Sequence, residues 1–324
     1  MFEVMPGEDA MFRLTAAVLL GMAVAAWAAP AGASPARVFN IAHRGARSLA
    51  PENTLPAFRI AIARCGADMI ELDVHLSKDG VPVVIHDDTL ERTTDVARVF
   101  PQRAPWRVAD FTAAELMRLD AGSWFVEQDP FGQIRAGQVS ADDLALFCSG
   151  RVRLPTLKTA LALIKELGCR VNIELKNFPA YYPGLAEKVV AEVRQSGIAD
   201  RVLFSSFDHE ILAELRRLAP EIPRAALVED PVFPLKEYLV DLLGVVAYNP
   251  SRDVLGCDSI AWHREGRLRE DVVRRAREAG LEVFVWTVND PDQLAALVKV
   301  GVSGIFTDFP QRLRDLLHSP GAGR

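Results

Sequence analysis

Two histidines and three acidic residues lie near the ends of short apolar runs in this sequence. His43 and His86 each come at the end of such a run, and Glu71 and Asp73 lie two positions apart in another. Glu174 lies in a similar run about a hundred residues later. Imidazole titrates near neutral pH, so two histidines can accept and donate protons in one reaction. Neighbouring carboxylates, in turn, are the ligands of hard cations.

The three acids predict a metal site. Side chains alternate along a strand, so Glu71 and Asp73 point to the same side. Two carboxylates side by side repel each other unless one is protonated or a cation lies between them. With Glu174 on a neighbouring strand, the cluster favours Mg²⁺ or Ca²⁺. The alternative is a structural ion network in which these acids pair with Arg44 and Lys176.

The histidines are interpreted as a catalytic pair. Singly, each is more typical of a packed or surface residue, but together beside three acids they indicate general acid–base catalysis. Arg44 can bind phosphate oxygens with two hydrogen bonds, and Lys176 adds a second fixed positive charge. Trp286 either forms a wall for a small polyol or is an aromatic of the core rim. The other histidines are interpreted as surface or structural: His75, His209, His263 and His318.

These residues require a scaffold that brings distant strand ends together. Apolar strand-like runs are predicted at 38–42, 69–74, 82–86, 171–175, 202–206, 225–228, 244–248, 282–287 and 304–307. Amphipathic helices are predicted at 156–167, 184–196, 208–218, 269–279 and 291–299. Such alternation predicts a parallel sheet, and about eight units predict an α/β fold of the closed (β/α)₈ type. In that fold the carboxyl ends of the strands line the active site.

One predicted strand cannot belong to the parallel set. Only seven residues separate Val74 from Pro82, too few for a parallel crossover, so 82–86 is predicted to pair antiparallel with 69–74. That hairpin returns His86 to about the level of Glu71 and Asp73. The stretch 88–153 then becomes a long excursion with one short predicted helix at 112–118. We interpret it as an inserted cap over the mouth of the barrel.

The N-terminal segment predicts export. Arg13 precedes an apolar run at 14–29, and small residues follow at 31–33. This pattern is typical of a signal peptide over 1–33, which leaves 34–324 as a periplasmic or secreted barrel domain. The run is short for a spanning helix, so no stable membrane span is expected in the mature protein. Acidic residues before Met11 suggest that translation starts there, and an uncleaved membrane anchor is the alternative.

Composition bounds the remaining possibilities. The chain has 324 residues, 50% of them hydrophobic, and a net charge of -6. This acidic balance argues against a nucleic-acid partner. The cysteines are widely spread, and no cysteine spacing typical of a metal site is present. In an exported protein they form either two disulfides or a reduced, buried set: Cys65, Cys148, Cys169 and Cys257.

Six motifs in order resemble the glycerophosphodiester phosphodiesterase family. They are HRGARSLAPENT, ELDVHLSKDGVPVVIHD, NIELK, FSSF, VFVWTVN and GIFTDFP, and the match spans nearly the whole mature chain. The resemblance implies a TIM barrel with a small subdomain inserted after the second strand. By position, His43 and His86 match the catalytic histidines and Arg44 the phosphate-binding arginine. Lys176 matches a substrate-side lysine, and the metal ligands are matched by Glu71, Asp73 and Glu174.

The resemblance implies a hydrolase of lipid and glycerol metabolism that depends on a divalent cation, Ca²⁺ or Mg²⁺. Its expected substrates are small glycerophosphodiesters such as glycerophosphocholine or glycerophosphoethanolamine, cut to sn-glycerol 3-phosphate and an alcohol. The alternative is a lysophospholipase D or sphingomyelinase-D-like activity on lipids. It predicts an apolar track on the cap, with candidate residues Trp106, Phe111, Trp124, Phe125, Phe131 and Phe147. A binding protein without turnover would lack a histidine or a ligand, and none is missing.

Overall fold

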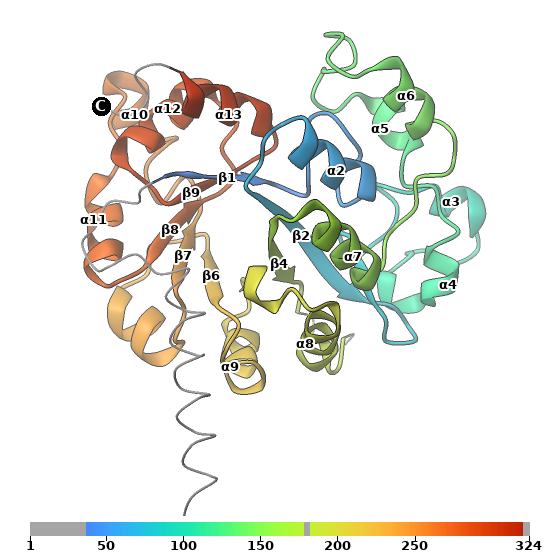
Figure 1. Ribbon diagram of the computed structural model, residues 1–324, viewed down its shortest axis with the longest axis horizontal. Coiled ribbons are helices and arrows are strands. Elements are labelled where there is room, and N and C mark those ends of the chain that lie inside the picture. The colour runs from blue at the N-terminus through green and yellow to red at the C-terminus, as the bar shows by residue number, and fades with distance from the viewer. Residues whose placement is uncertain (1–36, 178–181, 320–324) are drawn as a thin grey trace, which may run out of the picture.

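A closed barrel of eight parallel strands forms the centre of the protein. The computed structural model describes residues 37–177 and 182–319. Each strand pairs with the next, and the last pairs with the first, which confirms the predicted (β/α)₈ barrel (Figure 1). The strands are β1 (Phe39–Ala42), β2 (Met69–Leu76), β4 (Arg170–Leu175), β5 (Val202–Ser206), β6 (Arg224–Val228), β7 (Ala247–Pro250), β8 (Glu282–Val285) and β9 (Gly304–Thr307).

Helices surround the barrel and begin and end where the sequence signals them. The Thr54 hydroxyl accepts a hydrogen bond from Ala57 N at the start of α2, and left-handed Gly197 and Gly301 end α8 and α12. The helices outside the insertion are α2 (Leu55–Ala63), α7 (Leu157–Leu167), α8 (Leu185–Ser196), α9 (His209–Leu218), η3 (Lys236–Leu242), α10 (Ile260–Glu265), α11 (Glu270–Glu278), α12 (Pro291–Val300) and α13 (Pro310–His318). A short 3₁₀ helix, η2 (Ala199–Arg201), also lies outside the insertion. It was not predicted, and neither were the π-helix η3, the short α10 and the last helix α13.

Apolar side chains fill the barrel interior below the carboxyl ends of its strands. They form one cluster of Ile41, Met69, Leu203, Ala225, Ala247, Phe284 and Phe306. Alternation along each strand then places the next inward residues nearer the carboxyl ends. On β2, Met69 is followed inward by Glu71 and Asp73. The packed interior therefore leads directly up to the polar groups.

The predicted hairpin is present. β3 (Pro82–Val84) runs antiparallel to β2, with Val74 opposite Val84, and Ile85 N donates to Asp73 O at 3.1 Å. The chain after β3 therefore returns to the level of the β2 acids, as the sequence predicts for His86.

The insertion between β3 and α7 contains more helix than predicted. The predicted helix at 112–118 appears as α4 (Ala113–Leu116), but the expectation of one helix is wrong. Four further elements are present: α3 (Val96–Val99), η1 (Val108–Asp110), α5 (Ser123–Gln128) and α6 (Ala141–Phe147). Each has seven residues or fewer, too short for a helical period to show in the sequence. Figure 1 shows these green helices beside α2, β2 and α7.

Aromatic residues of the insertion form its core. Phe111, Trp124, Phe125 and Phe147 are each 9% exposed or less. Phe111 packs in a cluster with Val83 and Ile85, and the other three pack in a cluster that includes Ala57 and Ile60 of α2. The expectation that these four residues line an apolar track is therefore wrong, because folding the short helices uses their side chains. That the insertion covers the mouth stays a prediction.

The predicted signal peptide, 1–33, lies outside the described residues. Within 37–177 and 182–319, no helix combines the length and apolarity needed to cross a bilayer. The structure pairs none of the cysteines: Cys65, Cys169 and Cys257 are buried, and Cys148 is exposed.

Candidate active site

A small cavity opens at the carboxyl ends of the strands. It measures about 100 Å³, and seven of the eight predicted site residues line it: His43, Arg44, Glu71, His86, Glu174, Lys176 and Trp286. Its other lining residues are Asn172, Phe207, Leu227, Thr287 and Phe306. The eighth predicted residue, Asp73, is buried beside it and contacts Lys176. The structure thus brings the whole predicted constellation together.

Three buried carboxylates form the acidic part of the site. One oxygen of each of Glu71, Asp73 and Glu174 lies within 4.8 Å of the others. Alternation along β2 places the first two on one side, and the β2–β4 register sets Glu174 opposite Asp73. Arg44 N donates to Glu71 Oε2 at 2.7 Å, and Asn53 Nδ2 donates to Asp73 Oδ2 at 2.7 Å. Both donors have positive φ, 55° and 56°, so their backbones adopt the sparsely populated left-handed region at this site.

Two cations partly compensate the acids. Lys176 Nζ lies 2.5 Å from Glu174 Oε1 and 3.1 Å from Asp73 Oδ1, and Arg44 Nε lies 3.5 Å from Asp73 Oδ2. Burial acts to raise the pKa of Asp73, but Lys176 and Arg44 lower that pKa well below its usual range. Burial, with the charges of Asp73 and Glu174, raises the pKa of Glu71 well above its usual range. The ion network that was the alternative is therefore present, but it leaves Glu71 poorly compensated.

The acid cluster fits a hard divalent cation. Glu71 Oε1 is buried and has no hydrogen-bond partner among the described residues. A buried carboxylate oxygen without a partner is costly unless a cation or a proton meets it. Oxygen donors from three carboxylates are the ligand type that Mg²⁺ and Ca²⁺ take. The donor set of Glu71, Asp73 and Glu174 therefore matches the predicted metal site.

Each of the two histidines is held by a carboxylate. His43 Nδ1 lies 2.8 Å from Asp308 Oδ1, and His86 Nδ1 lies 2.6 Å from Asp87 Oδ1. Because Nδ1 is engaged in both rings, Nε2 is the nitrogen left for a ligand. Burial lowers the pKa of His43, and the charge of Arg44 lowers it further. His43 is thus a neutral imidazole at neutral pH.

The carboxylates that hold the two histidines were not predicted from the sequence. Asp308 follows β9 directly and is fixed on its other oxygen by Asn289 Nδ2 at 2.7 Å. Asp87 follows His86 in the chain. Both acids stand in the quoted motifs GIFTDFP and VIHD. The signal that could have found them is an acid next to a strand end beside a predicted catalytic histidine.

Glu52, interpreted only as a possible structural residue, connects three arginines. Its carboxylate accepts hydrogen bonds from Arg44 at 2.9 Å, Arg47 at 2.7 Å, and Arg92 at 2.7 and 3.1 Å. Burial acts to raise the pKa of Glu52, but the Arg92 hydrogen bonds and the charges of Arg44 and Arg47 lower it well below its usual range. Glu52 is therefore ionised and orders the arginines around the site.

His75 supports the site from behind. It is fully buried, with Nε2 2.9 Å from His86 O and Nδ1 2.9 Å from the Tyr182 hydroxyl. The structural interpretation of this histidine is confirmed. Its ring fixes the backbone of His86 and lies outside the cavity.

Aromatic side chains wall one side of the cavity. Trp286 Nε1 donates to Asn249 O at 2.8 Å, and the Phe207 ring meets the indole edge-on at 5.2 Å. Phe207, from the FSSF motif, was not singled out from the sequence. Trp286 lines the cavity, and its role as a wall for a small polyol stays a prediction.

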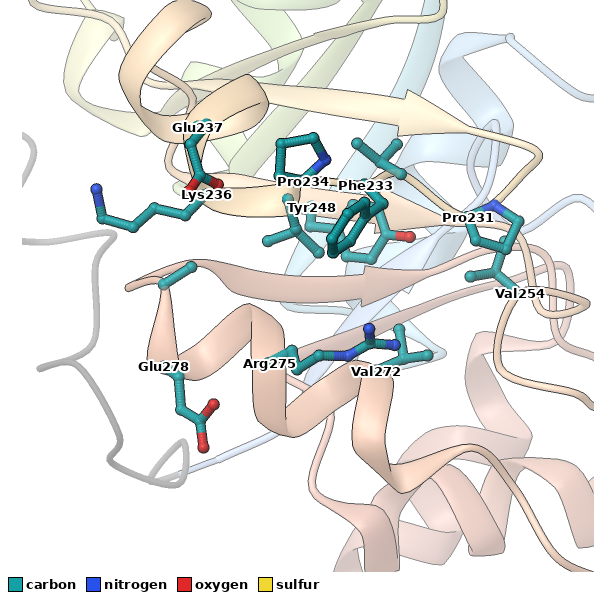
Figure 2. A pocket seen from close by; sticks show the side chains of 13 residues that line it. Pro231, Phe233, Pro234, Lys236, Glu237, Tyr248, Val254, Val272, Arg275 and Glu278 are labelled. Atoms are coloured by element: carbon teal, nitrogen blue, oxygen red, sulfur yellow. The ribbon is translucent and has the colours of Figure 1, made fainter.

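A larger cavity of about 340 Å³ lies elsewhere, between the segment after β6 and α11. Figure 2 shows Phe233, Pro234 and Tyr248 facing it from one side, and Val272 and Arg275 from the other. None of the eight predicted site residues lines it. Charged side chains from two elements, Lys236, Glu237, Arg275 and Glu278, lie among its lining residues, and none of the three clustered carboxylates does.

Comparison with known proteins identifies the family of this chain. The model of the Glycerophosphoryl diester phosphodiesterase family matches residues 43–312. A glycerophosphodiester phosphodiesterase of Caldanaerobacter subterraneus is 34% identical over 282 residues, which cover 87% of this chain and 98% of that protein. One from Bacillus altitudinis is 36% identical over 272 residues, covering 84% and 94%.

Solved structures show the same fold. A phosphodiesterase from Oleispira antarctica, determined in complex with its product sn-glycerol-3-phosphate, has a TM-score of 0.66 and 28% identity. The similarity covers 88% of this chain and 98% of that one. A glycerophosphodiester phosphodiesterase from Agrobacterium tumefaciens has a TM-score of 0.62 and 27% identity over 84% and 97% of the two chains.

Proposed function

Since this chain belongs to the glycerophosphoryl diester phosphodiesterase family, we propose that it hydrolyses small glycerophosphodiesters to sn-glycerol 3-phosphate and an alcohol such as choline or ethanolamine. Glycerophosphodiester phosphodiesterase activity follows from the family and its relatives. The observation that carries the finer proposal is the pair of carboxylate-bound histidines facing one cavity with three buried acids.

The histidines divide the proton transfers. His43, whose pKa burial lowers, is neutral and accepts the proton of the nucleophile at Nε2. His86, with 31% of its side chain exposed, protonates the departing alkoxide. Asp308 and Asp87 hold the two rings so that the same nitrogen of each faces the substrate. The phosphorus–oxygen bond to the alcohol breaks as the new phosphorus–oxygen bond forms.

The nucleophile is the glycerol 2-hydroxyl or a water. Attack by the hydroxyl gives a cyclic phosphate that water then opens. Detection of the cyclic species during turnover supports this route. Oxygen-18 from solvent that enters the product without any cyclic species contradicts it.

Two positively charged side chains bind the phosphate. Arg44 and Lys176 line the cavity, and each balances its charge against the acids beside it. Their fixed charges stabilise the phosphoryl oxygens as negative charge builds up on them. A divalent cation held by Glu71, Asp73 and Glu174 would add Lewis-acid stabilisation of the same oxygens. Trp286 and Phe207 exclude water from one side and form an apolar wall for the glycerol carbons.

The structure favours a small diester over a lysolipid. The cavity is about 100 Å³, and within the described chain no residue of the insertion lines it. Four of the six aromatic residues expected to bind an acyl chain are buried in the core of the insertion. The N-terminal segment has the pattern of a signal peptide, which predicts export. We therefore propose that the enzyme acts on such diesters in the periplasm or outside the cell.

The test is release of glycerol 3-phosphate from glycerophosphocholine by the mature protein. After EDTA treatment we expect no release, and we expect it to return with Ca²⁺ or Mg²⁺. His43→Ala and His86→Ala should each lower turnover by about 10² or more while the folded state persists, since each removes one proton transfer. Turnover close to wild type in either variant contradicts the assignment. Release from micellar lysophosphatidylcholine, but not from glycerophosphocholine, would favour a lipid substrate.

A further inference from the structure

One arginine of the insertion reaches the catalytic machinery without lining the cavity. Arg92 Nε donates to Asp87 Oδ2 at 2.6 Å, and one of its terminal nitrogens donates to Asp87 Oδ1 at 3.0 Å. The same guanidinium donates to both oxygens of Glu52, at 2.7 and 3.1 Å. It therefore binds two carboxylates at once, each with two hydrogen bonds.

We propose that Arg92 is a positioning residue for the hydrolysis: it clamps Asp87 onto Glu52 and thereby fixes the His86 imidazole at the cavity. This inference rests on the proposed function and on His86 as a catalytic histidine. It gives the insertion a role in the reaction, which is to hold His86 in place at the cavity.

Asp87 needs such support because local geometry does not supply it. Asp87 and His86 are neighbours in the chain, and side chains of adjacent residues in extended backbone point to opposite sides. Their contact at 2.6 Å lies in a bend after β3, and Asp87 is 25% exposed. A partly exposed ion pair contributes little by itself, because holding both side chains in one geometry costs entropy, so a third group that binds Asp87 adds order. Arg92 is that group, because its Nε and one terminal nitrogen bind the two Asp87 oxygens.

Glu52 is a buried carboxylate that holds the Arg92 guanidinium in place. The Glu52 side chain is 2% exposed and also binds Arg44 and Arg47. The planar fork of an arginine can bind two carboxylates with defined geometry, which the single ammonium of a lysine cannot. The Asp87 carboxylate is thus tied through Arg92 to a buried residue next to Arg44.

The other histidine is held differently. Asp308, which binds His43, accepts a hydrogen bond from Asn289 Nδ2 at 2.7 Å, and Asp308 N donates to Asn289 Oδ1 at 2.9 Å. These partners belong to the barrel itself. Asp308 also contacts Arg47 at 3.3 Å, and Arg47 binds Glu52. Removal of Arg92 takes two hydrogen bonds directly from Asp87 and reaches Asp308 only through Glu52 and Arg47, so it should impair the step that depends on His86 more than the step that depends on His43.

The experiment compares two substrates in the Ca²⁺-loaded enzyme: glycerophosphocholine and the glycerophosphodiester of p-nitrophenol, whose leaving group departs without a proton. For Arg92→Gln we expect kcat on glycerophosphocholine to fall about tenfold to hundredfold, up to the ~10² of a general acid. KM and the Ca²⁺ concentration for half-maximal activity should change little. The loss of kcat on glycerophosphocholine, divided by the loss of kcat on the p-nitrophenyl diester, should equal the same ratio measured for His86→Ala.

A double-mutant cycle tests the route through Asp87. If Arg92 acts by holding Asp87, Asp87→Asn and Arg92→Gln together should cost about as much as either alone, since coupled residues are not additive. Arg92→Lys should restore only part of kcat, because lysine cannot bind both carboxylates. If Arg92→Gln does not fold, Arg92→Lys and Asp87→Asn take its place in the kinetic comparison.

The matched control is Arg103→Gln. Arg103 lies in the same insertion, is 33% exposed against 37% for Arg92, and pairs with Glu115 instead of a site residue. The proposal is overturned if Arg92→Gln keeps kcat within twofold of wild type, loses no more than Arg103→Gln, or adds fully to Asp87→Asn. An inactive wild-type enzyme on both substrates contradicts the proposed function instead.

Discussion

At the scale of the residue, His75 shows how a side chain outside the cavity controls one inside it. Its imidazole is fully buried between His86 O and the Tyr182 hydroxyl. Burial lowers the pKa of His75 to about 4, because the charged ring would lose its hydration. The neutral ring donates one hydrogen bond to the His86 carbonyl and accepts one from the tyrosine. The backbone of His86, a proposed catalytic residue, is therefore held by a histidine that is uncharged in the folded protein.

This requirement predicts a pH-dependent stability. Unfolded histidine titrates near 6.5, so between pH 6.5 and about 4 the unfolded chain binds a proton here and the folded chain does not. The free energy of unfolding therefore falls as the pH decreases through this window, by roughly 3 kcal/mol in all. Urea unfolding at pH 7 and pH 5 should show a smaller difference for His75→Gln than for wild type. Equal losses in the two proteins would contradict the prediction.

Single residues also show what sequence reasoning can reach. His86 could be placed beside the acids because seven residues and a turn fix the β2–β3 register. The partner of His43 could not, since Asp308 is 265 positions away and its contact depends on closure of the barrel. Arg92 is still harder to predict. No periodicity marks it, and its two carboxylates come from different segments.

At the scale of the element, most of the barrel was predictable, and the insertion was less so. The strand at 202–206 and the one at 304–307 have the predicted bounds, because buried parallel strands are short apolar runs. The sixth barrel strand, β7, was expected at 244–248 and lies at Ala247–Pro250. The preceding Gly244–Val246 is equally apolar, so composition alone does not mark where pairing begins. The helices of the insertion form through packing contacts that a local pattern does not record.

The insertion should accordingly be held by its aromatic core. Phe125 is 1% exposed and meets the rings of Trp124 at 6.0 Å and Phe147 at 5.8 Å, both edge-on. Phe125→Ala leaves a cavity there, and we expect the free energy of unfolding to fall by about 3–5 kcal/mol. Denaturant unfolding measures this loss.

The matched control for this substitution is Phe233→Ala, at a phenylalanine that is 87% exposed, where the change should be within about 0.5 kcal/mol. A loss at Phe125 as small as that at Phe233 would show that the insertion core contributes little. It would also reopen the possibility that these aromatic residues are free to bind an acyl chain.

At the scale of the whole molecule, the fold concentrates like charge at the mouth of its barrel. Parallel strands that end together bring Glu71, Asp73 and Glu174 within 4.8 Å, although the chain separates β2 from β4 by the entire insertion. Lys176 and Arg44 offset part of this charge. A scaffold that is otherwise well packed therefore carries a local electrostatic cost, which a divalent cation would relieve.

The raised pKa of Glu71 determines how this electrostatic cost changes with pH. A proton bound to the folded carboxyl stabilises the protein at low pH. That stabilisation is lost as the pH rises from the usual range through the raised pKa. The metal-free protein should therefore lose stability from this group as the pH increases, the opposite of the effect of His75. A cation competes with the proton, so Ca²⁺ should stabilise more at pH 8 than at pH 5.

Glu71→Gln separates these effects, because the amide is uncharged but its oxygen can still accept the Arg44 N hydrogen bond now seen at 2.7 Å. In EDTA the variant should be more stable than wild type at pH 8, since repulsion is removed. Wild type with Ca²⁺ at a hundredfold its Kd should gain about 2.7 kcal/mol, and the variant much less. Denaturant unfolding with and without Ca²⁺ measures these differences in the free energy of unfolding and needs no assay of turnover. An equal Ca²⁺ gain in both proteins would place the cation elsewhere than on Glu71.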